Sequence, residues 1–356
     1  MKAEKKAVTI NDIARAAGVS KTTVSRYING KHSLMKEETR NHIQAVIEMT
    51  NYHPNSIAQS LKSGRSYQIG IVVADITSPF SSSLIRGIEQ VLLENNYVAF
   101  LADSHDSVEL EQQVIESLLS RKVDGLIVNT SDCHNPFLIQ NAVNGVPIVL
   151  CDRYVNDFKF SFVGSAHDQP LFQAVEHLKE EGFAKVAFFT QEYSSNSARY
   201  IRRNTWLRAL GEFYPDLDAE PLSVTIDIND MAGTISALKN LLDGCKDGEI
   251  PAIIGVNTIT VMHVIAAIRS LGLRLPKDIG ICGPDDWGQG EQINWPVIVS
   301  PGITTFSVPS YEIGRSAAQV LLEQICDPDA PKREVLFPSE LEIRSSTRLK
   351  SAEKFP

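Results

Sequence analysis

The chain has 356 residues, of which 43% are hydrophobic, so it is too long for one ordinary domain and apolar enough to form well-buried cores. Its five cysteines lie far apart and form no CxxC pair, so they indicate neither a disulfide framework nor a zinc site, and we expect buried thiols in a reducing cytosol. No apolar run has the form of a signal peptide or approaches the ~18 residues of a membrane span; we therefore expect a cytoplasmic protein without a membrane partner.

The net charge of −9 argues against a nucleic-acid partner, but the distribution of the charge reverses that argument. Residues 1–66 contain 11 Lys and Arg against 5 Asp and Glu, which leaves 23 and 38 for residues 67–356. The head therefore carries a net +6 and the body a net −15. A basic head on an acidic body is typical of a polyanion-binding module joined to an unrelated domain. A solvated charge run is the alternative, but the basic residues are scattered through a segment with apolar periodicity.

Three short helices are predicted within the first 50 residues. Thr9 is a candidate N-cap for the first helix, and Gly18 ends it because glycine accepts a positive φ. Ser20 caps a second helix, Lys21 to Ile28, and a third helix runs from Glu37 to Met49. Apolar residues at helical spacing give each helix an inward face. These residues are Ile10, Ile13, Ala14, Ala17, Val24, Ile28, Ile43, Val46 and Ile47.

A short segment from Ser56 to Leu61 has helical character and stands between Pro54 and the flexible run Ser63-Gly64-Arg65-Ser66. Pro54 suits the first turn of a helix. A helix of about seven residues is marginal by itself in water, so we expect this one to become ordered only against another surface.

From Tyr67 onward, apolar runs of strand length alternate with amphipathic helices. Repeated βα units with unbroken apolar strands predict parallel sheets covered on both faces, and the number of units indicates two doubly wound lobes. Open α/β sheets bind ligands at the carboxyl ends of their strands, so two lobes facing each other make a cleft. The predicted strands are Ile69–Ala74, Val98–Leu101, Gly125–Val128, Pro147–Cys151, Lys185–Phe189, Ala252–Val256 and Ile279–Cys282. The predicted helices include Phe80–Asn95, Ser107–Ser120, Leu171–Glu181, Ala198–Phe213 and Thr258–Ser270.

The segment from Ile10 to Arg26, INDIARAAGVSKTTVSR, resembles the DNA-binding headpiece of the lactose/galactose-repressor family. The resemblance continues in order along nearly the whole chain. The further matching motifs are Tyr52-His53-Pro54-Asn55, Phe80, Gly283-Pro284-Asp285-Asp286, Ile303-Thr304-Thr305-Phe306 and Glu342-Ile343-Arg344-Ser345-Ser346-Thr347.

The resemblance implies three parts. They are an all-α helix-turn-helix headpiece at 1–53, a hinge helix and linker at 54–66, and an α/β effector-binding and dimerisation domain at 67–356. The last part is expected to contain two doubly wound parallel-sheet lobes of the periplasmic-binding-protein type. Lobe 1 is expected at about 67–166 and 297–326, and lobe 2 at about 167–296 and 327–348.

The recognition helix of a helix-turn-helix motif enters the major groove and presents its N-terminal side chains to base edges. Lys21, Thr22 and Arg26 are the candidates for base reading, because Lys and Arg can donate to guanine and Thr can contact a thymine methyl group. Polar residues nearby, and the helix N-terminus itself, suit phosphates. The candidate backbone contacts are Thr9, Ser20, Thr23, Ser25, Asn29 and His32. An exposed polar helix face is the alternative for any one of these residues taken alone.

The resemblance also implies that Asn55–Leu61 is a hinge helix that folds on operator binding, with one copy per subunit in the minor groove. Leu61 matches the leucine that wedges a central base step, and such wedges kink DNA. Asn55 and Ala58 match groove-lining positions. A core leucine is the alternative for Leu61, but its flanking residues are polar and flexible.

A sugar-sized ligand needs hydrogen bonds to several hydroxyls and an apolar or aromatic floor. The family's contact positions fall on residues of both expected lobes. The candidates in lobe 1 are Ser78, Pro79, Phe80, Asp152 and Arg153. Those in lobe 2 are Arg202, Asn257 and Asp285, with Trp287 nearby as a stacking surface. Surface ion pairs are the alternative for the charged residues, and ordinary packing is the alternative for Trp287.

Two departures from the family pattern bear on the effector. The family often has Asp where this chain has Thr258, and Gly where it has Thr205. Losing a carboxylate while keeping several arginines makes the cleft less hostile to an anion, and an Arg can hold a carboxylate bidentately. These arginines are Arg153, Arg199, Arg202 and Arg203. We therefore hypothesise an acidic sugar effector. Segments 62–66 and 73–80 also resemble the subgroup that regulates use of keto-sugar acids such as 2-keto-3-deoxygluconate or 2-ketogluconate.

Together these features predict a sequence-specific transcriptional regulator, a repressor that binds a palindromic operator as a homodimer. The tail after Arg344 has no heptads, so a C-terminal helical route to tetramers is not expected. A sugar-binding protein of the periplasmic type is the alternative, but it has no use for residues 1–66. An enzyme is not expected, because no GxGxxG follows the first strand and no P-loop, GxSxG or HExxH occurs. Neither a cofactor nor a metal is predicted.

Overall fold

The structure is a computed structural model, and it describes residues 8–28, 33, 35–52, 64–166, 168–285 and 294–352, without the side chains of Asp285 and Ala352. The chain divides into two compact units between Ser66 and Tyr67, which is where the sequence analysis ends the linker. None of the described helices combines the length and the apolar character that crossing a membrane requires. The candidate hinge residues Asn55, Ala58 and Leu61 lie outside the described residues.

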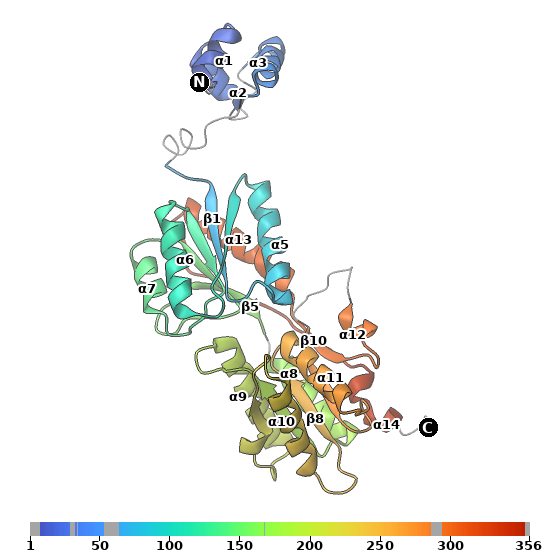
Figure 1. Cartoon of the computed structure of the whole chain (residues 1–356). Helices are drawn as coiled ribbons and strands as arrows, with labels where there is room; N and C mark the ends of the chain where they lie inside the picture. Colours follow the sequence, from blue (N-terminus) through green and yellow to red (C-terminus); the bar gives the residue numbers. More distant parts are fainter. Residues whose placement is uncertain are drawn as a thin grey trace, which may run out of the picture. The chain divides into compact units, whose positions relative to one another are not determined.

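The first unit is a three-helix headpiece, as the apolar spacing predicts. Its helices are α1 (Ile10–Ala16), α2 (Lys21–Ile28) and α3 (Glu37–Thr50) (Figure 1). Thr9 caps α1: its hydroxyl oxygen accepts the N–H of Asp12 at 3.4 Å, and the Asp12 carboxylate accepts the N–H of Thr9 at 3.0 Å. Gly18 has a φ of +62°, which the tight turn from α1 to α2 requires and glycine adopts without strain.

The three helices share a small apolar core whose fully buried members are Ile13, Val24 and Ile43. Val24 is the buried residue of α2, so this helix is fixed to the other two by a narrow stripe. Tyr27 and Ile28 are partly buried against the same core, and the remaining face of α2, with Lys21, Thr22 and Arg26, is exposed.

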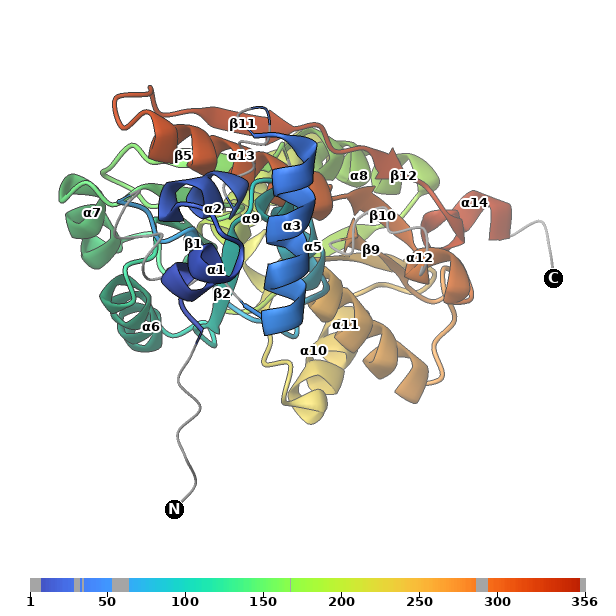
Figure 2. The same cartoon turned by 90° about the horizontal axis from the view of Figure 1, so that it is seen from above.

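Lobe 1 of the second unit is a six-stranded sheet in the order β11-β5-β4-β3-β1-β2, and all neighbouring strands are parallel. The strands are β1 (Gln68–Val73), β2 (Val98–Asp103), β3 (Gly125–Val128), β4 (Ile148–Cys151), β5 (Ser161–Ser165) and β11 (Glu334–Phe337). Two helices cover each face of the sheet (Figures 1 and 2). These pairs are α5 (Pro79–Glu94) with α13 (Ser310–Cys326), and α6 (Val108–Ser120) with α7 (Pro136–Val143).

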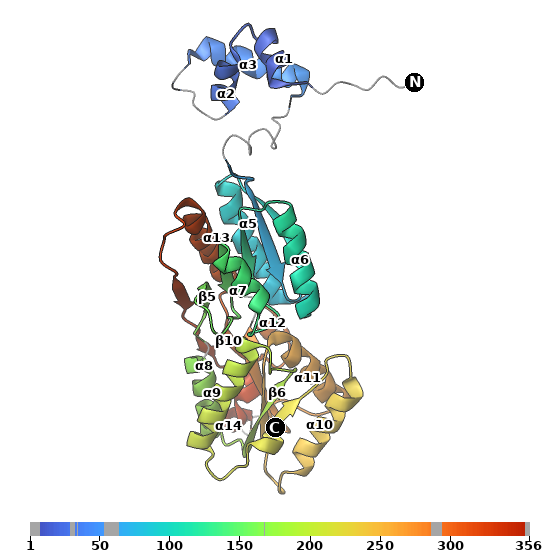
Figure 3. The same ribbon diagram turned by 90° about the vertical axis from the view of Figure 1, so that its left-hand side faces the viewer.

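Lobe 2 is also a six-stranded sheet, in the order β12-β10-β9-β8-β6-β7, and only the short β12 is antiparallel to its neighbour. The strands are β6 (Lys185–Thr190), β7 (Ser223–Thr225), β8 (Pro251–Gly255), β9 (Gly280–Asp285), β10 (Thr304–Ser307) and β12 (Leu341–Glu342). One helix pair covers each face (Figure 3). These pairs are α8 (Asp168–Glu181) with α9 (Ser197–Phe213), and α10 (Met231–Asp243) with α11 (Thr258–Ser270). Shorter helices are η2 (Glu220–Leu222), α12 (Trp295–Ile298), η3 (Ser345–Thr347) and α14 (Leu349–Ala352).

The expected lobe boundaries after residue 296 are wrong. Residues 297–326 were assigned to lobe 1, but β10 pairs with β9 in lobe 2, so the second crossing comes only after Ser307. Residues 327–348 were assigned to lobe 2, but β11 pairs with β5 in lobe 1. The chain therefore crosses between lobes three times, after β5, β10 and β11. The sequence of a short strand with polar residues does not indicate which sheet the strand joins. Strand pairing with distant parts of the chain determines that.

The apolar runs find seven of the twelve described strands and miss five short ones. β3 and β4 are fully buried at all four positions, so their sequences are unbroken and apolar. The predicted set lacks β5, β7, β10, β11 and β12. Of these, β7, β11 and β12 lie at sheet edges, and β5 and β10 are largely buried but contain serine or threonine, so none of the five reads as an apolar run.

Helices α5 and α13 approach so closely that glycine is required on both. A Cβ atom on Gly87 would overlap the backbone oxygen of Tyr311, and one on Gly314 would overlap the backbone oxygen of Leu84. Neither oxygen can move away without shifting its helix. This contact therefore fixes the helix pair that covers one face of lobe 1.

Gly314→Ala is expected to lower the free energy of unfolding by about 1–3 kcal/mol, because the two helices leave no space for the added methyl group. Gly211→Ala, in α9, is the matched control: nothing lies within 4 Å of its Cβ position. That variant is expected to be unchanged or more stable by roughly 0.5–1 kcal/mol. Thermal unfolding followed by circular dichroism compares the two, and equal stability of both variants would contradict the tight contact.

Candidate functional site

The three candidate base-reading residues share the outer face of α2. Lys21, Thr22 and Arg26 are all exposed, and Thr22 and Arg26 are four residues apart and therefore neighbours on the helix. Val24, on the opposite side, holds the helix in the headpiece core. This arrangement leaves a protruding polar helix face with two cations, which suits a nucleic-acid groove.

Three of the candidate backbone contacts, Thr9, Ser20 and Thr23, lie at the N-terminal ends of α1 and α2. The Ser20 hydroxyl accepts the N–H of Thr23 at 3.1 Å and lies 2.9 Å from the Thr23 hydroxyl, so both side chains help to cap α2. Thr9 caps α1 in the same way. Ser25 is half-buried on α2. Asn29 and His32 lie outside the described residues.

The second candidate site is a pocket at the carboxyl ends of the strands of both lobes. Residues of lobe 1 and lobe 2 line it together. They are Asp75, Ser78, Phe80, Ser81, Asn129, Asp152, Arg153, Asn196, Ala198, Arg199, Arg202 and Asn257. Six of the nine effector-site candidates are among them: Ser78, Phe80, Asp152, Arg153, Arg202 and Asn257. The structure thus brings together residues separated by up to 179 positions, from Ser78 to Asn257.

Of the other three candidates, Pro79 is described and does not line the pocket, whereas the Asp285 side chain and Trp287 lie outside the described part of the structure. Pro79 is the first residue of α5 and serves to start that helix. Asp285 ends β9, at the carboxyl edge of the lobe 2 sheet, and its side chain is outside the described part of the structure. Trp287 also lies outside the described residues.

Three helices begin at this pocket. Ser78, Asn196 and Asn257 are the N-cap residues of α5, α9 and α11, and each lines it. The side-chain oxygen of Asn196 accepts the N–H of Arg199 at 3.1 Å, and that of Asn257 accepts the N–H of Thr260 at 2.8 Å. Each helix N-terminus carries a partial positive charge, so all three favour a negatively charged ligand.

Two arginines in the pocket share one carboxylate, Asp106. Arg153 donates to Asp106 at 2.5 Å, and Arg199 lies 3.3 Å from it. Burial by itself would raise the pKa of Asp106, but the two guanidinium groups overcome it and hold that pKa below its usual value. Asp106 was not predicted, because nothing in the sequence around it shows that two arginines from different lobes meet there.

The charged form of Arg199 is destabilised by its surroundings. Burial, followed by repulsion from Arg153, lowers the pKa of Arg199 to about 10, against the opposing attraction of Asp106. At neutral pH the group is still a cation. An anion placed beside it would relieve both the desolvation and the repulsion.

Arg202 is 5% exposed and is held at the back of the pocket. One of its nitrogens donates to the backbone oxygen of Val256 at 3.0 Å, and the other end nitrogen lies 3.7 Å from the Asp152 carboxylate. Asp152 has a φ of +60° at the end of β4, a conformation that non-glycine residues rarely adopt. An ion pair from lobe 2 to lobe 1 therefore crosses the pocket.

The two departures from the family pattern have simple structural roles. The hydroxyl of Thr258 donates to the backbone oxygen of Pro284 at 2.9 Å, and the side chain is fully buried. Thr258 is not among the pocket-lining residues. The carboxylate that the family often has at this position is therefore missing, and the threonine hydroxyl does not replace it as a ligand contact. Thr205 donates to Asp168 at 2.8 Å, away from the pocket. Arg203 donates to Ser223 at 2.8 Å and is not a lining residue either, so only three of the four arginines reach the pocket.

Two family models match the chain. The model described as "Bacterial regulatory proteins, lacI family" matches residues 9–55, and "Periplasmic binding proteins and sugar binding domain of LacI family" matches residues 66–346. The second match alone spans more than half of the chain and contains every lining residue of the pocket.

Relatives and a solved structure agree with these models. The HTH-type transcriptional regulator KdgR of Bacillus subtilis is 34% identical over 325 residues, which cover 91% of this chain and 93% of the relative. The HTH-type transcriptional regulator PtxS of Pseudomonas aeruginosa is 32% identical over 340 residues, 96% of each chain. The lac repressor dimer bound to operator and the anti-inducer ONPF has the same fold, with a TM-score of 0.80 at 24% identity over 96% of this chain and 99% of that one.

Proposed function

The chain belongs to the LacI family of bacterial regulatory proteins, which are DNA-binding transcriptional regulators and not enzymes, and from this premise we propose that it is a repressor controlled by an acidic sugar. The exposed face of α2 reads operator DNA in the major groove, with Lys21, Thr22 and Arg26 as base-contacting residues. Because the headpiece presents one recognition helix, a palindromic operator requires two copies of the chain, and the protein acts as a homodimer in the cytoplasm.

The charge of the pocket carries the proposal for the effector. Three guanidinium groups line it, from Arg153, Arg199 and Arg202. They face the lining carboxylates of Asp75 and Asp152 and the Asp106 carboxylate that Arg153 and Arg199 share. Three helix N-termini add to the positive potential. A carboxylate on the ligand would take a bidentate place on an arginine, and the sugar hydroxyls would bond the asparagine and serine side chains.

The sequence resemblance supports the same class of effector. KdgR and PtxS are HTH-type transcriptional regulators, and segments 62–66 and 73–80 of this chain resemble the subgroup that regulates use of keto-sugar acids such as 2-keto-3-deoxygluconate or 2-ketogluconate. We therefore propose a six-carbon keto-sugar acid. Its carboxylate lies against the arginines of α9, and its hydroxyls lie toward Asn129 and Asn257.

The experiment is a fluorescence anisotropy titration of the full chain with labelled DNA from the region upstream of its own gene. Salt-dependent, sequence-specific binding is expected, together with a change in affinity when 2-ketogluconate or 2-keto-3-deoxygluconate is added. Neutral sugars of the same size serve as controls. Failure to bind any specific DNA overturns the regulator, whereas DNA binding that responds only to neutral sugars overturns the acidic effector.

Arg26→Ala is expected to weaken specific operator binding by about 1–3 kcal/mol and to relax the choice of base at one position of each half-site. Arg15→Ala is the matched control, since Arg15 is an exposed arginine of α1 whose side chain lies near Asp12, at 3.6 Å. Loss of that cation is expected to affect all DNA sequences alike. Unchanged discrimination among operator variants by the Arg26 variant would remove Arg26 from base reading.

A further inference from the structure

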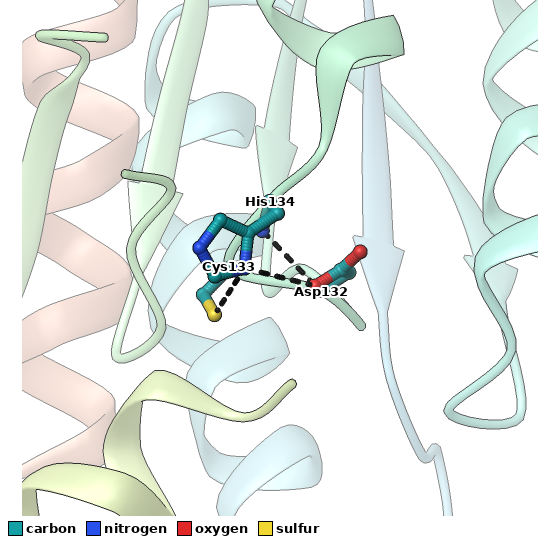
Figure 4. Close-up of side chains that lie close together, drawn as sticks. All are labelled: Asp132, Cys133 and His134. Atoms are coloured by element: carbon teal, nitrogen blue, oxygen red, sulfur yellow. Dashed lines mark hydrogen bonds and ion pairs between the residues drawn. The ribbon is translucent and has the colours of Figure 1, made fainter. Parts of the chain in front are cut away.

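The loop between β3 and α7 presents three different metal-ligating side chains in a row, Asp132, Cys133 and His134 (Figure 4). Their ligand atoms all lie within 4.8 Å of one another. The Cys133 sulfur is 3.2 Å from Nδ1 of His134, and that nitrogen is 4.0 Å from the Asp132 carboxylate. Ligand atoms of a tetrahedral zinc ion, with bonds of about 2.0–2.3 Å, lie roughly 3.3–3.8 Å apart. The separations of 3.2 Å and 4.0 Å lie within a few tenths of an ångström of this range, so small side-chain rotations bring the ligand atoms to the spacing that an ion requires.

The backbone of this loop is held in place from both sides. The Asp132 carboxylate accepts the N–H of His134 at 3.0 Å, which folds the loop back on itself. The buried carboxylate of Glu111 accepts the N–H of Ser131 at 2.6 Å and an N–H of the Asn135 side chain at 2.6 Å. The three ligands are thus carried on a preorganised segment, which lowers the entropy that metal binding must overcome.

The chemistry of the three groups selects one class of ion. A thiolate, an imidazole and one carboxylate together suit Zn²⁺ and similar transition metals, whereas Mg²⁺ and Ca²⁺ prefer oxygen ligands alone. Cys133 is only 6% exposed, but the His134 side chain is 64% exposed, so an ion can enter from the histidine side. The side-chain amide nitrogen of Asn156 lies 3.2 Å from Nε2 of His134. With Nδ1 on the metal, Nε2 carries the proton, so Asn156 orients the ring once its amide turns to place the oxygen, an acceptor, at this position.

The loop also forms part of the contact between the lobes. The N–H of Cys133 donates to the backbone oxygen of Ser195 at 2.8 Å, and the Cys133 sulfur lies 3.9 Å from the backbone oxygen of Ser194. Both serines belong to the loop between β6 and α9 in lobe 2. The same loop continues into Asn196, which lines the effector pocket.

We propose that Asp132, Cys133 and His134 form a site for Zn²⁺ or a similar thiophilic divalent metal at the seam between the two lobes. Three protein ligands bind the ion, water takes a fourth position, and the Cys133 proton is released to solvent on binding. An ion here fixes the loop that contacts lobe 2. Cysteine spacing gave no sign of such a site, because motif searches look for paired cysteines and this site has one.

The test uses the metal-free full chain titrated with Co²⁺, which reports its ligands by colour. One Co²⁺ per chain is expected, with a thiolate-to-cobalt charge-transfer band in the near ultraviolet and visible bands typical of four-coordinate cobalt. Added Zn²⁺ is expected to bleach both, since zinc binds such ligands more tightly than cobalt. Absence of a charge-transfer band overturns the proposal.

Variants distinguish metal binding at this site from nonspecific metal binding at the protein surface. Cys133→Ser and His134→Ala are expected to abolish the charge-transfer band or weaken cobalt binding at least ten-fold. The matched controls are Cys326→Ser, which removes an exposed cysteine at the end of α13, and His105→Ala, which removes an exposed histidine 3.3 Å from Asp103. Both controls are expected to bind as the parent chain does.

Because the His134 side chain is exposed, the His134→Ala variant is expected to fold as the parent chain does. Circular dichroism checks that it does. Retention of full cobalt affinity by the folded His134 variant overturns the site, and so does loss of the band in the Cys326 variant. None of these readouts depends on DNA or on the sugar acid. A negative result for the metal site therefore leaves the proposed function unaffected, and the reverse also holds.

Discussion

Arg202→Ala is expected to raise the Kd for the effector at least 30-fold and to abolish the effector's influence on operator binding. Truncating one partner of a buried charge pair costs about 2–5 kcal/mol in binding, because the other group stays buried without its partner. Here the buried guanidinium spans the pocket from α9 to Asp152, 3.7 Å away, and bonds the backbone oxygen of Val256. Isothermal titration calorimetry with a keto-sugar acid measures the loss.

The headpiece is a separate unit, so operator binding without effector is expected to stay within a few fold of the parent chain. Arg208→Ala is the matched control on the same helix: Arg208 is 63% exposed and pairs with Asp168 at 3.0 Å. That variant is expected to bind the effector normally. Arg202→Lys keeps the charge but loses the planar fork, and an intermediate affinity is expected. A normal response in Arg202→Ala would remove this residue from the effector site.

Glu111→Ala is expected to destabilise the effector-binding domain by about 3–5 kcal/mol. Glu111 is fully buried, and its carboxylate accepts from the Thr130 hydroxyl at 2.8 Å, the Ser131 N–H at 2.6 Å and the Asn135 side chain at 2.6 Å. Its removal leaves the Ser131 N–H and the Asn135 amide without this acceptor, whereas the Thr130 hydroxyl keeps the Asp132 backbone oxygen at 3.1 Å. Each buried donor that loses its acceptor costs about 1–3 kcal/mol. Urea unfolding followed by circular dichroism measures the change.

Glu116→Ala is the control for this variant. Glu116 is an exposed residue of the same helix, α6, and accepts from Gln112 at 3.0 Å. A change within about 0.5 kcal/mol is expected there. Equal stability of the two variants would show that the buried carboxylate does not hold the loop from Thr130 to Asn135.

The pH dependence of the parent chain gives a second measure of Glu111. Burial raises the pKa of this carboxyl, against the opposing hydrogen bonds from Ser131 and Thr130. The folded state therefore binds its proton more tightly than the unfolded chain does. The stabilisation of the folded state by protonated Glu111 is fully present below the pKa of this group in the unfolded chain. It declines as the pH rises through the raised pKa of the folded state. The stability difference between the parent and Glu111→Ala is expected to shrink over that window.

Local sequence signals determined the headpiece. Thr9, Gly18 and Ser20 mark helix ends through contacts with residues at most four positions away, so the chain shows these boundaries without its tertiary structure. The same holds for strands such as β3 and β4, whose four buried positions carry no polar side chain.

Resemblance to a known family placed most of the candidate pocket residues but not their partners. Asp106, which joins Arg153 to Arg199, and Asn196, which caps α9 at the pocket, were not predicted. Glu111 was missed as well, since in sequence it is one more acidic residue on an amphipathic helix. Nothing in the local pattern distinguishes these side chains from exposed ones.

The sequence by itself thus determined the three headpiece helices, seven of the strands and the family that the chain resembles, and it predicts which helix reads DNA. Only the tertiary structure decided the sheet that β10 and β11 join, the pairing of Asp106 with two arginines, and the meeting of the Cys133 loop with Ser194 and Ser195. The physical reason is range. Helix caps and apolar periodicity act within a few residues, whereas strand pairing and ion pairs join groups that are tens to hundreds of positions apart and leave no trace in the neighbouring sequence.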